Sequence, residues 1–181
     1  KEILERDGIT IIEMDIETPD HLRVLFQELL LNYFMLYYLH KGEVEKEHIE
    51  TVIVLEEFPN MLPKSKIEFQ VGGEIINKLF KEGRKFGIGL IAIAQESSEL
   101  PNYVTANCKV QFNFAAQTKK DIEATSGSMF LKKHEIPFLD YIWQGECFAK
   151  IKGRVKNCLL KIPASPIKGK ITDEELKELM K

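Results

Sequence analysis

The chain has few of the features that mark disulfide-rich, membrane-spanning or strongly charged proteins. Its three cysteines, Cys108, Cys147 and Cys158, are too widely spaced for a disulfide framework or a metal knuckle, so we expect buried, reduced thiols in a cytoplasmic protein. A net charge of −3 gives no general attraction to nucleic acid or membrane, so any DNA contact must be local. Residues 29–39, the most apolar segment, are too short to span a bilayer. The charged first residues give no signal-peptide pattern.

A second absence concerns phosphate binding. The pattern G-x-x-x-x-G-K-[ST], whose backbone amides cradle nucleotide phosphates, occurs nowhere in the 181 residues. Residues 81–89 contain three glycines and three cations, but their spacing differs from that pattern. They also end a predicted helix, and the carboxyl end of a helix repels phosphate. This segment is therefore not a phosphate cradle.

The hydrophobic pattern that is present alternates between strand and helix periods. A hydrophobic content of 44% and a charged content of 29% fit a soluble globular protein, either one domain or part of a larger one. Strands and helices that alternate with short connections predict an α/β fold with a mainly parallel sheet. We predict strands at residues 8–17, 51–56, 88–95 and 108–114, helices at residues 18–41, 71–86, 118–127 and 172–181, and an antiparallel hairpin at residues 143–163.

Two of these elements carry expectations about packing. The helix at residues 18–41 should begin with Thr18 as its N-cap and end at Gly42. Apolar residues occupy much of its circumference, so we expect it to pack on both a sheet and a neighbour. The strand at residues 88–95 is continuously apolar, which predicts that both of its faces are covered.

Glu56 and Glu57 follow an apolar strand with no turn residue between. Neighbouring strand residues point to opposite faces, so we expect two roles: one carboxylate orients a hydrated metal ion, and the other aligns a water molecule for attack. A buried carboxylate needs a partner, so a cation is expected beside them. The alternative is that both glutamates simply mark the exit of the strand into solvent.

Gln95 and Arg84 are the next candidates. Ligands of open α/β sheets bind beyond the carboxyl ends of the strands, and Gln95 ends such a strand, although a single glutamine is a weak signal. Arg84 lies at a helix end before Gly87. It either complements the helix dipole or is held rigidly to reach a phosphate on a neighbouring surface. The cations at residues 150–156 form the best candidate for a basic surface.

In this order, three segments resemble the HerA/FtsK-like P-loop ATPases, and most of all the HerA group and its relatives among the conjugation ATPases. The segments are VIVLEEFP at residues 52–59, KEGRKFGIGLIAIAQ at residues 81–95 and IWQGECFAKIKGRVKNCLLKIP at residues 142–163. The strand predicted at residues 8–17 matches the one that precedes Walker B in that family. The resemblance extends over residues 8–163.

The resemblance implies an ATP- and Mg²⁺-dependent hydrolase with a RecA-like sheet flanked by helices. Glu56 would orient Mg²⁺, and Glu57 would be the catalytic acid that polarises the attacking water. Gln95 would be the sensor near the γ-phosphate, and Arg84 would contact nucleotide phosphate, in some members from a neighbouring subunit. The resemblance also implies double-stranded DNA, a homo-hexamer and a nuclease or conjugation-machinery partner. It assigns no DNA-binding residue.

The sequence departs from the pattern of that family in two places near Walker B. Glu56 stands where many members have Asp, and Phe58-Pro59 replaces the commoner Ala-His. The phosphate loop of that family precedes Walker B, and this chain lacks it. We therefore interpret residues 1–163 as the C-terminal portion of a RecA-like ATPase domain, an incomplete P-loop NTPase core. Residues 164–181 would be a linker and a C-terminal helix, and ATP would be hydrolysed only in the full-length parent.

Two other interpretations remain open. In the first, the chain is a degenerate, non-catalytic relative of these ATPases that acts as a binding or assembly module. In the second, it is an unrelated protein with a flavodoxin-like fold. The flavodoxin-like interpretation requires a metal-dependent phosphotransfer site in which Glu13, Glu56 and Glu57 meet at one sheet edge.

Overall fold

A computed structural model gives the positions of most of the chain. The residues that it describes are 8–15, 17–44, 48–61 and 74–164. The predicted linker and C-terminal helix, apart from residue 164, lie outside these ranges. Among the described residues, no helix has both the length and the apolar composition needed to cross a membrane.

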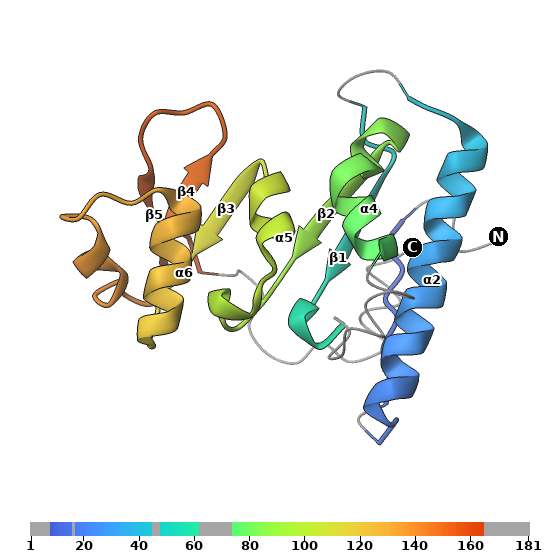
Figure 1. The fold of residues 1–181 in the computed structure, drawn as a ribbon, viewed down its shortest axis with the longest axis horizontal. Coiled ribbons are helices and arrows are strands. Elements are labelled where there is room, and N and C mark those ends of the chain that lie inside the picture. Colours follow the sequence, from blue (N-terminus) through green and yellow to red (C-terminus); the bar gives the residue numbers. More distant parts are fainter. Residues whose placement is uncertain (1–7, 16, 45–47, 62–73, 165–181) are drawn as a thin grey trace.

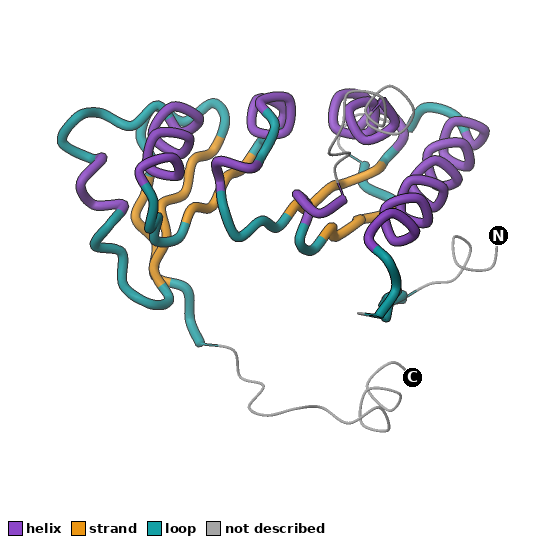
Figure 2. Tube along the Cα trace, turned by 60° about the horizontal axis from the view of Figure 1, so that its bottom comes forward, coloured by secondary structure: helices purple, strands orange, loops and turns teal. Residues whose placement is uncertain are grey.

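The strands form two sheets that lie side by side (Figures 1 and 2). β1 (Thr51–Leu55) pairs in parallel with β2 (Ile88–Ala92), with Leu55 opposite Ala92. The second sheet is antiparallel, in the order β3, β4, β5. Its strands are β3 (Val110–Asn113), β4 (Glu146–Ile151) and β5 (Cys158–Lys161). The predicted α/β class and C-terminal hairpin are confirmed, and in the described part of the chain the parallel pairing is confined to β1 and β2.

The helices lie on one face of the strand layer (Figure 2). The α-helices are α2 (Asp20–Lys41), α4 (Glu74–Glu82), α5 (Asn102–Asn107) and α6 (Lys119–Met129). Short 3₁₀ turns connect them: η1 (Phe58–Met61), η3 (Gly83–Phe86), η4 (Ser97–Glu99) and η5 (Ile136–Leu139).

Two hydrophobic cores hold the helices on the sheets. The larger lies under α2 and α4, where Met35, Phe58 and Ile76 are completely or almost completely buried. The smaller lies under α6, around Met129 and Phe148. Each fully buried side chain of this kind contributes about 1.5–3 kcal/mol, so these cores fix the helices on the strands.

The opposite face of the strands is apolar and has no helix over it in the described part of the chain (Figure 2). Ile91 and Ile93 are 50% and 47% exposed, so the prediction that both faces of this strand are covered is wrong for the described residues. Phe112 of β3 is also exposed, at 56%. It points away from α6, because the next residue, Asn113, bonds to Thr125 of that helix.

Helix α2 also has one buried face and one exposed face. Leu31, Met35 and Tyr38 pack into the larger core. The opposite stripe is about half exposed and comprises Leu22, Leu25, Phe26, Leu29, Tyr33 and Leu36. The expected packing on a sheet and a neighbour is confirmed for the buried face, since Tyr38 donates a hydrogen bond to Thr51 of β1 and α2 contacts α4.

The ends of α2 differ in how well the sequence predicts them. Gly42 ends the helix as predicted, with φ of 99° and its N–H bonded to the Tyr38 carbonyl at 3.1 Å. Thr18 is not the N-cap: the helix begins at Asp20 after Pro19, and no side-chain cap forms. The Thr18 N–H instead donates to the Asp15 carbonyl at 3.0 Å.

Several other predicted boundaries are corrected. None of residues 8–15 and 17 lies in a strand, since β composition without a paired edge does not make one. In the described residues α4 covers Glu74–Glu82 and tightens into η3 at Gly83, so the predicted helix is divided in two, while its predicted start at residues 71–73 lies outside the described ranges. Helix α5 was not predicted because six residues after a proline give too short a periodic signal. α6 continues past Gly127, and the left-handed Phe130, with φ of 55°, ends it.

Candidate functional site

The chain that follows β1 is fixed to the end of β2. Ile93 donates its N–H to the Leu55 carbonyl, and Phe58 donates its N–H to the Ile93 carbonyl, both at 2.9 Å. Phe58 is completely buried and anchors the segment in the core. Between these bonds the chain makes a tight turn, in which Glu57 adopts a left-handed φ of 53°. Such a conformation is costly for a residue with a side chain, and it is typical of functional turns.

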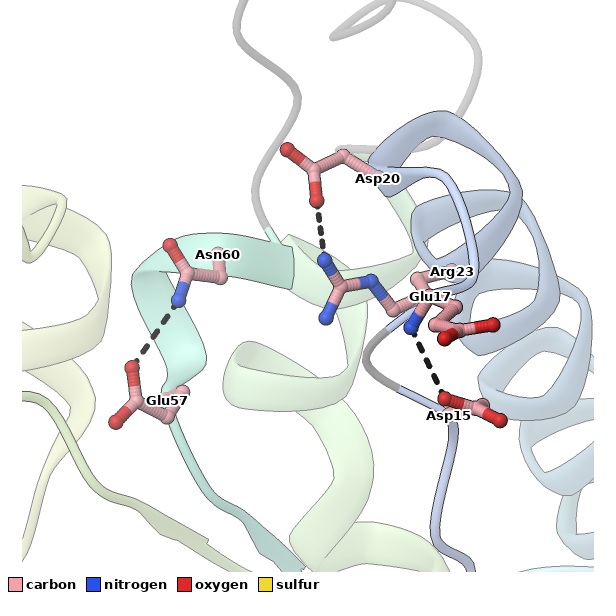
Figure 3. Close-up of polar contacts among 6 residues, drawn as sticks. All are labelled: Asp15, Glu17, Asp20, Arg23, Glu57 and Asn60. Carbon is pink, nitrogen blue, oxygen red and sulfur yellow. Dashed lines mark hydrogen bonds and ion pairs between the residues drawn. The ribbon is translucent and has the colours of Figure 1, made fainter.

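The turn presents the Glu57 carboxylate to two amide side chains. Gln95, three residues beyond β2, donates from Nε2 to Glu57 Oε1. Asn60 in η1 donates from Nδ2 to Glu57 Oε2 at 3.1 Å (Figure 3). Both oxygens are therefore oriented, while the side chain remains exposed to solvent. A carboxylate keeps further lone pairs after two bonds, so Glu57 can also accept a proton or bond from a water molecule.

Glu56 lies in the same turn and is also exposed. The expected burial of the two acids is wrong, because both glutamates reach solvent. The partners of Glu57 in this chain are neutral amides, and the expected cation stays a prediction. Mg²⁺ commonly binds one or two carboxylates and completes its shell with water and phosphate. Glu56 as a ligand of Mg²⁺ stays a prediction.

A metal site made of this chain's side chains alone is not supported. No three His, Cys, Asp or Glu residues come together at metal-binding distance in the described ranges, which include Glu13, Glu56 and Glu57. The flavodoxin-like interpretation needed those three carboxylates at one edge. That interpretation is wrong.

Arg84 is not part of this cluster. It lies in η3, before β2 begins, whereas Gln95 lies after β2 ends. Five strand residues at about 3.3 Å each put the two at opposite ends of β2. Gly87, with a left-handed φ of 72°, holds the turn by donating its N–H to the Arg84 carbonyl at 3.3 Å. The exposed Arg84 side chain therefore serves a different surface from Glu57 in the same molecule.

A second polar cluster, which sequence reasoning missed, begins two residues after Gln95. Asp121 of α6 is only 5% exposed. Its carboxylate accepts bonds from the Ser98 N–H at 2.9 Å and the Thr118 hydroxyl at 2.6 Å. Burial opposes the charge, but these hydrogen bonds outweigh it and lower the pKa of Asp121. Ser97 bonds to Thr125 of α6 at 2.8 Å.

This cluster connects the segment carrying Gln95 to α6. The signal in the sequence is the capping pattern Thr118-x-x-Asp121, in which the Thr118 hydroxyl accepts the Asp121 N–H at 3.1 Å. The pattern predicts a helix start, which explains the fold of this segment. It does not predict that the same carboxylate reaches across to η4.

Several solved structures have a similar fold. VirB4 of Thermoanaerobacter pseudethanolicus matches with a TM-score of 0.61 and 22% identity, over 83% of this chain and 39% of that chain. The genome packaging NTPase B204 from Sulfolobus turreted icosahedral virus 2, in complex with ATP-gammaS, matches with a TM-score of 0.64 and 15% identity, over 90% and 71%. B204, the DNA-packaging ATPase from Sulfolobus turreted icosahedral virus, matches with a TM-score of 0.61 and 16% identity, over 84% of this chain and 66% of that chain.

The chain therefore shares its fold with parts of VirB4 and of the packaging ATPase B204. The chain spans only 39% of the VirB4 chain. The similarity is therefore to a part of that chain. No protein-family model and no curated protein sequence matches it.

Proposed function

We propose that this chain is the Walker B and sensor part of an ATP-driven DNA translocase or helicase-type motor. The observation that carries the proposal is the contact between Gln95 and Glu57. It joins the ends of two parallel strands, which is where ligands of open α/β sheets bind. The fold shared with the genome packaging NTPase B204, which binds ATP-gammaS, supports ATP as the ligand.

The four predicted site residues then have distinct roles. Glu57 accepts the proton of the attacking water, and Gln95 keeps the carboxylate oriented while it senses the γ-phosphate. Glu56 holds Mg²⁺, which neutralises phosphate charge when it is bound. Arg84 lies at the other end of β2, so it would reach the nucleotide of a neighbouring copy in a homo-hexamer.

The strand layer supports the interpretation of an incomplete core. In the described part of the chain, β2 pairs only with β1, and β3 pairs only with β4. Their other edges are open, and a strand that carries the missing phosphate loop would fit between the two sheets. Residues 1–163 would then be the C-terminal portion of a RecA-like domain, and residues 164–181 a linker and helix. We place the complete motor in the cytoplasm, on double-stranded DNA, with a nuclease or conjugation-machinery partner.

The test compares ATP turnover and ATP binding in the protein that joins this chain to a phosphate loop. Glu57→Gln should lower kcat at least about 100-fold, the usual contribution of a general base, and leave ATP binding intact. Near-normal turnover would refute the role of Glu57. The 181-residue chain alone should show no tight Mg²⁺-dependent ATP binding by calorimetry. Tight binding would refute the interpretation as an incomplete core.

A second candidate is a degenerate, non-catalytic binding or assembly module. The observation that favours it is the absence of G-x-x-x-x-G-K-[ST] from the 181 residues. If the natural gene product contains no such loop and hydrolyses no ATP, this candidate replaces the first.

A further inference from the structure

The hairpin of β4 and β5 has a charge opposite to that of the whole chain. Between Trp143 and Pro163 it has five cations and a single carboxylate, Glu146, although the chain has a net charge of −3. Its tip is exposed, and Val155 is 100% exposed between two of the cations. The cations of the hairpin are Lys150, Lys152, Arg154, Lys156 and Lys161.

A groove of about 790 Å³ lies at the base of this hairpin. Its lining combines hairpin cations with polar, small and apolar residues, the last including Leu100, Cys108 and Ile151. One carboxylate, Glu123, also lines it. Neither Glu57 nor Gln95 does, so the groove is separate from the Glu57 site, although Ser97 of the second polar cluster lines it. The lining residues that matter here are Lys150, Lys152, Arg154, Thr105, Gln111 and Gly127.

An exposed aromatic ring lies at the edge of the groove. Phe130 lines it, is 80% exposed, and has the left-handed φ of 55° that ends α6. The Lys150 ammonium lies 4.1 Å from the centre of the ring and donates to the Ser128 carbonyl. Both contacts hold the ring in place and leave most of it accessible. A phenylalanine in this conformation is strained, and exposing its ring buries no apolar surface that would offset the cost.

We propose that this groove and hairpin bind single-stranded nucleic acid. Lys152 and Arg154, both exposed, would pair with successive phosphates, and Phe130 would stack on an unpaired base. Cations that follow the backbone beside an aromatic platform are what single-strand binding requires. A duplex keeps its bases stacked on each other, so it cannot use Phe130. The proposal rests on these charges and this ring, and it does not depend on the ATP site.

The test measures the binding of a fluorescently labelled 20-nucleotide oligothymidylate to the 181-residue chain by anisotropy, at several salt concentrations. Replacing both Lys152 and Arg154 by Ala should weaken binding and reduce the slope of log K against log salt by about 1.4, since each single-strand phosphate contact contributes about 0.7. Phe130→Gly should weaken binding about tenfold, and Phe130→Tyr should retain it. Glycine fits the left-handed turn, so loss of binding in Phe130→Gly cannot come from unfolding.

The matched control removes two cations elsewhere, at Lys81 and Lys85, which are exposed on α4 and η3. This variant should bind as the unmodified chain does. The proposal is overturned by any of four results: no binding at low salt, equal weakening by the control, full affinity in Phe130→Gly, or tighter binding of a duplex of the same length. None of these results involves ATP turnover, so a failure of this proposal can be distinguished from a failure of the proposed function.

Discussion

The Gln95 side-chain amide donates a hydrogen bond to the Glu57 carboxylate, 38 residues earlier in the chain. Glu57 lies in a left-handed turn after β1, and Gln95 lies beyond β2. Parallel pairing of β1 with β2 brings the two residues together. The contact therefore depends on the register of the sheet as well as on the identity of the two side chains.

This contact predicts that Gln95 positions Glu57 during hydrolysis. In the protein that carries a phosphate loop, Gln95→Ala should lower kcat at least about tenfold and change KM little, because a general base must be oriented toward its water. Steady-state ATPase kinetics measure both constants. The matched control is Gln117→Ala, an exposed glutamine before α6, which should leave both unchanged. A loss confined to KM would contradict the positioning role.

Gly87 should be intolerant of any side chain. Its φ is 72°, and an added Cβ would lie 3.1 Å from Glu50 Cγ and 3.3 Å from the Glu50 nitrogen. We expect Gly87→Ala to reduce the free energy of unfolding by about 1–2 kcal/mol or more, measured by urea denaturation. Gly127 is the control: it is helical and an added Cβ meets nothing within 4 Å. Gly127→Ala should therefore stabilise the chain by about 0.4–1 kcal/mol. Equal effects of the two substitutions would contradict this reasoning.

Asp121 should make stability depend on pH. Its folded-state pKa is lowered from 3.8, so its stabilisation is fully present above that value and is lost as the pH falls through the lower folded-state pKa. Asp121→Asn should cost about 1.5–3 kcal/mol in the free energy of unfolding at neutral pH, because hydrogen bonds to a charged acceptor are lost. The difference from the unmodified chain should narrow as the pH falls below 3.8. Urea denaturation across this range tests it, with the exposed Asp140→Asn as control. A difference that is constant with pH would contradict the assignment.

The three thiols should react at different rates. Cys147 is completely buried, whereas Cys108 and Cys158 are half-buried. Burial also raises the pKa of the Cys108 and Cys147 thiols, which reduces the reactive thiolate at neutral pH. We expect iodoacetamide to modify Cys158 first, Cys108 next and Cys147 last, as followed by mass spectrometry of the peptides. In urea the three rates should converge. Early modification of Cys147 under native conditions would contradict its burial in the folded chain.

Local sequence signals predicted the elements well where a cap or a period was present. Gly42 ends α2 as predicted, and the apolar run before Glu56 is strand β1. The segment at residues 8–17 shows the limit of such signals. It has strand composition, yet a strand exists only when an edge pairs with it, and composition does not contain that information.

The sequence predicted which residues form the candidate site but not how they are arranged. Glu56, Glu57 and Gln95 were predicted because they follow strands, and the ends of parallel strands meet at one edge of a sheet. The left-handed turn at Glu57 and the second amide, from Asn60, required coordinates. The sequence singled out Arg84 because it lies at a helix end. Only the structure, in which η3 precedes β2, shows that Arg84 lies away from Glu56, Glu57 and Gln95.

The uncovered apolar face of the strands has a calorimetric consequence. The heat capacity change of unfolding grows with the apolar surface that becomes newly hydrated, at about 12–15 cal/mol/K per residue for compact domains. Val52, Val54, Ile91 and Ile93 are already about half hydrated in the folded chain. The chain alone should therefore show a smaller heat capacity change per residue than a compact domain, and a protein that covers this face should restore it.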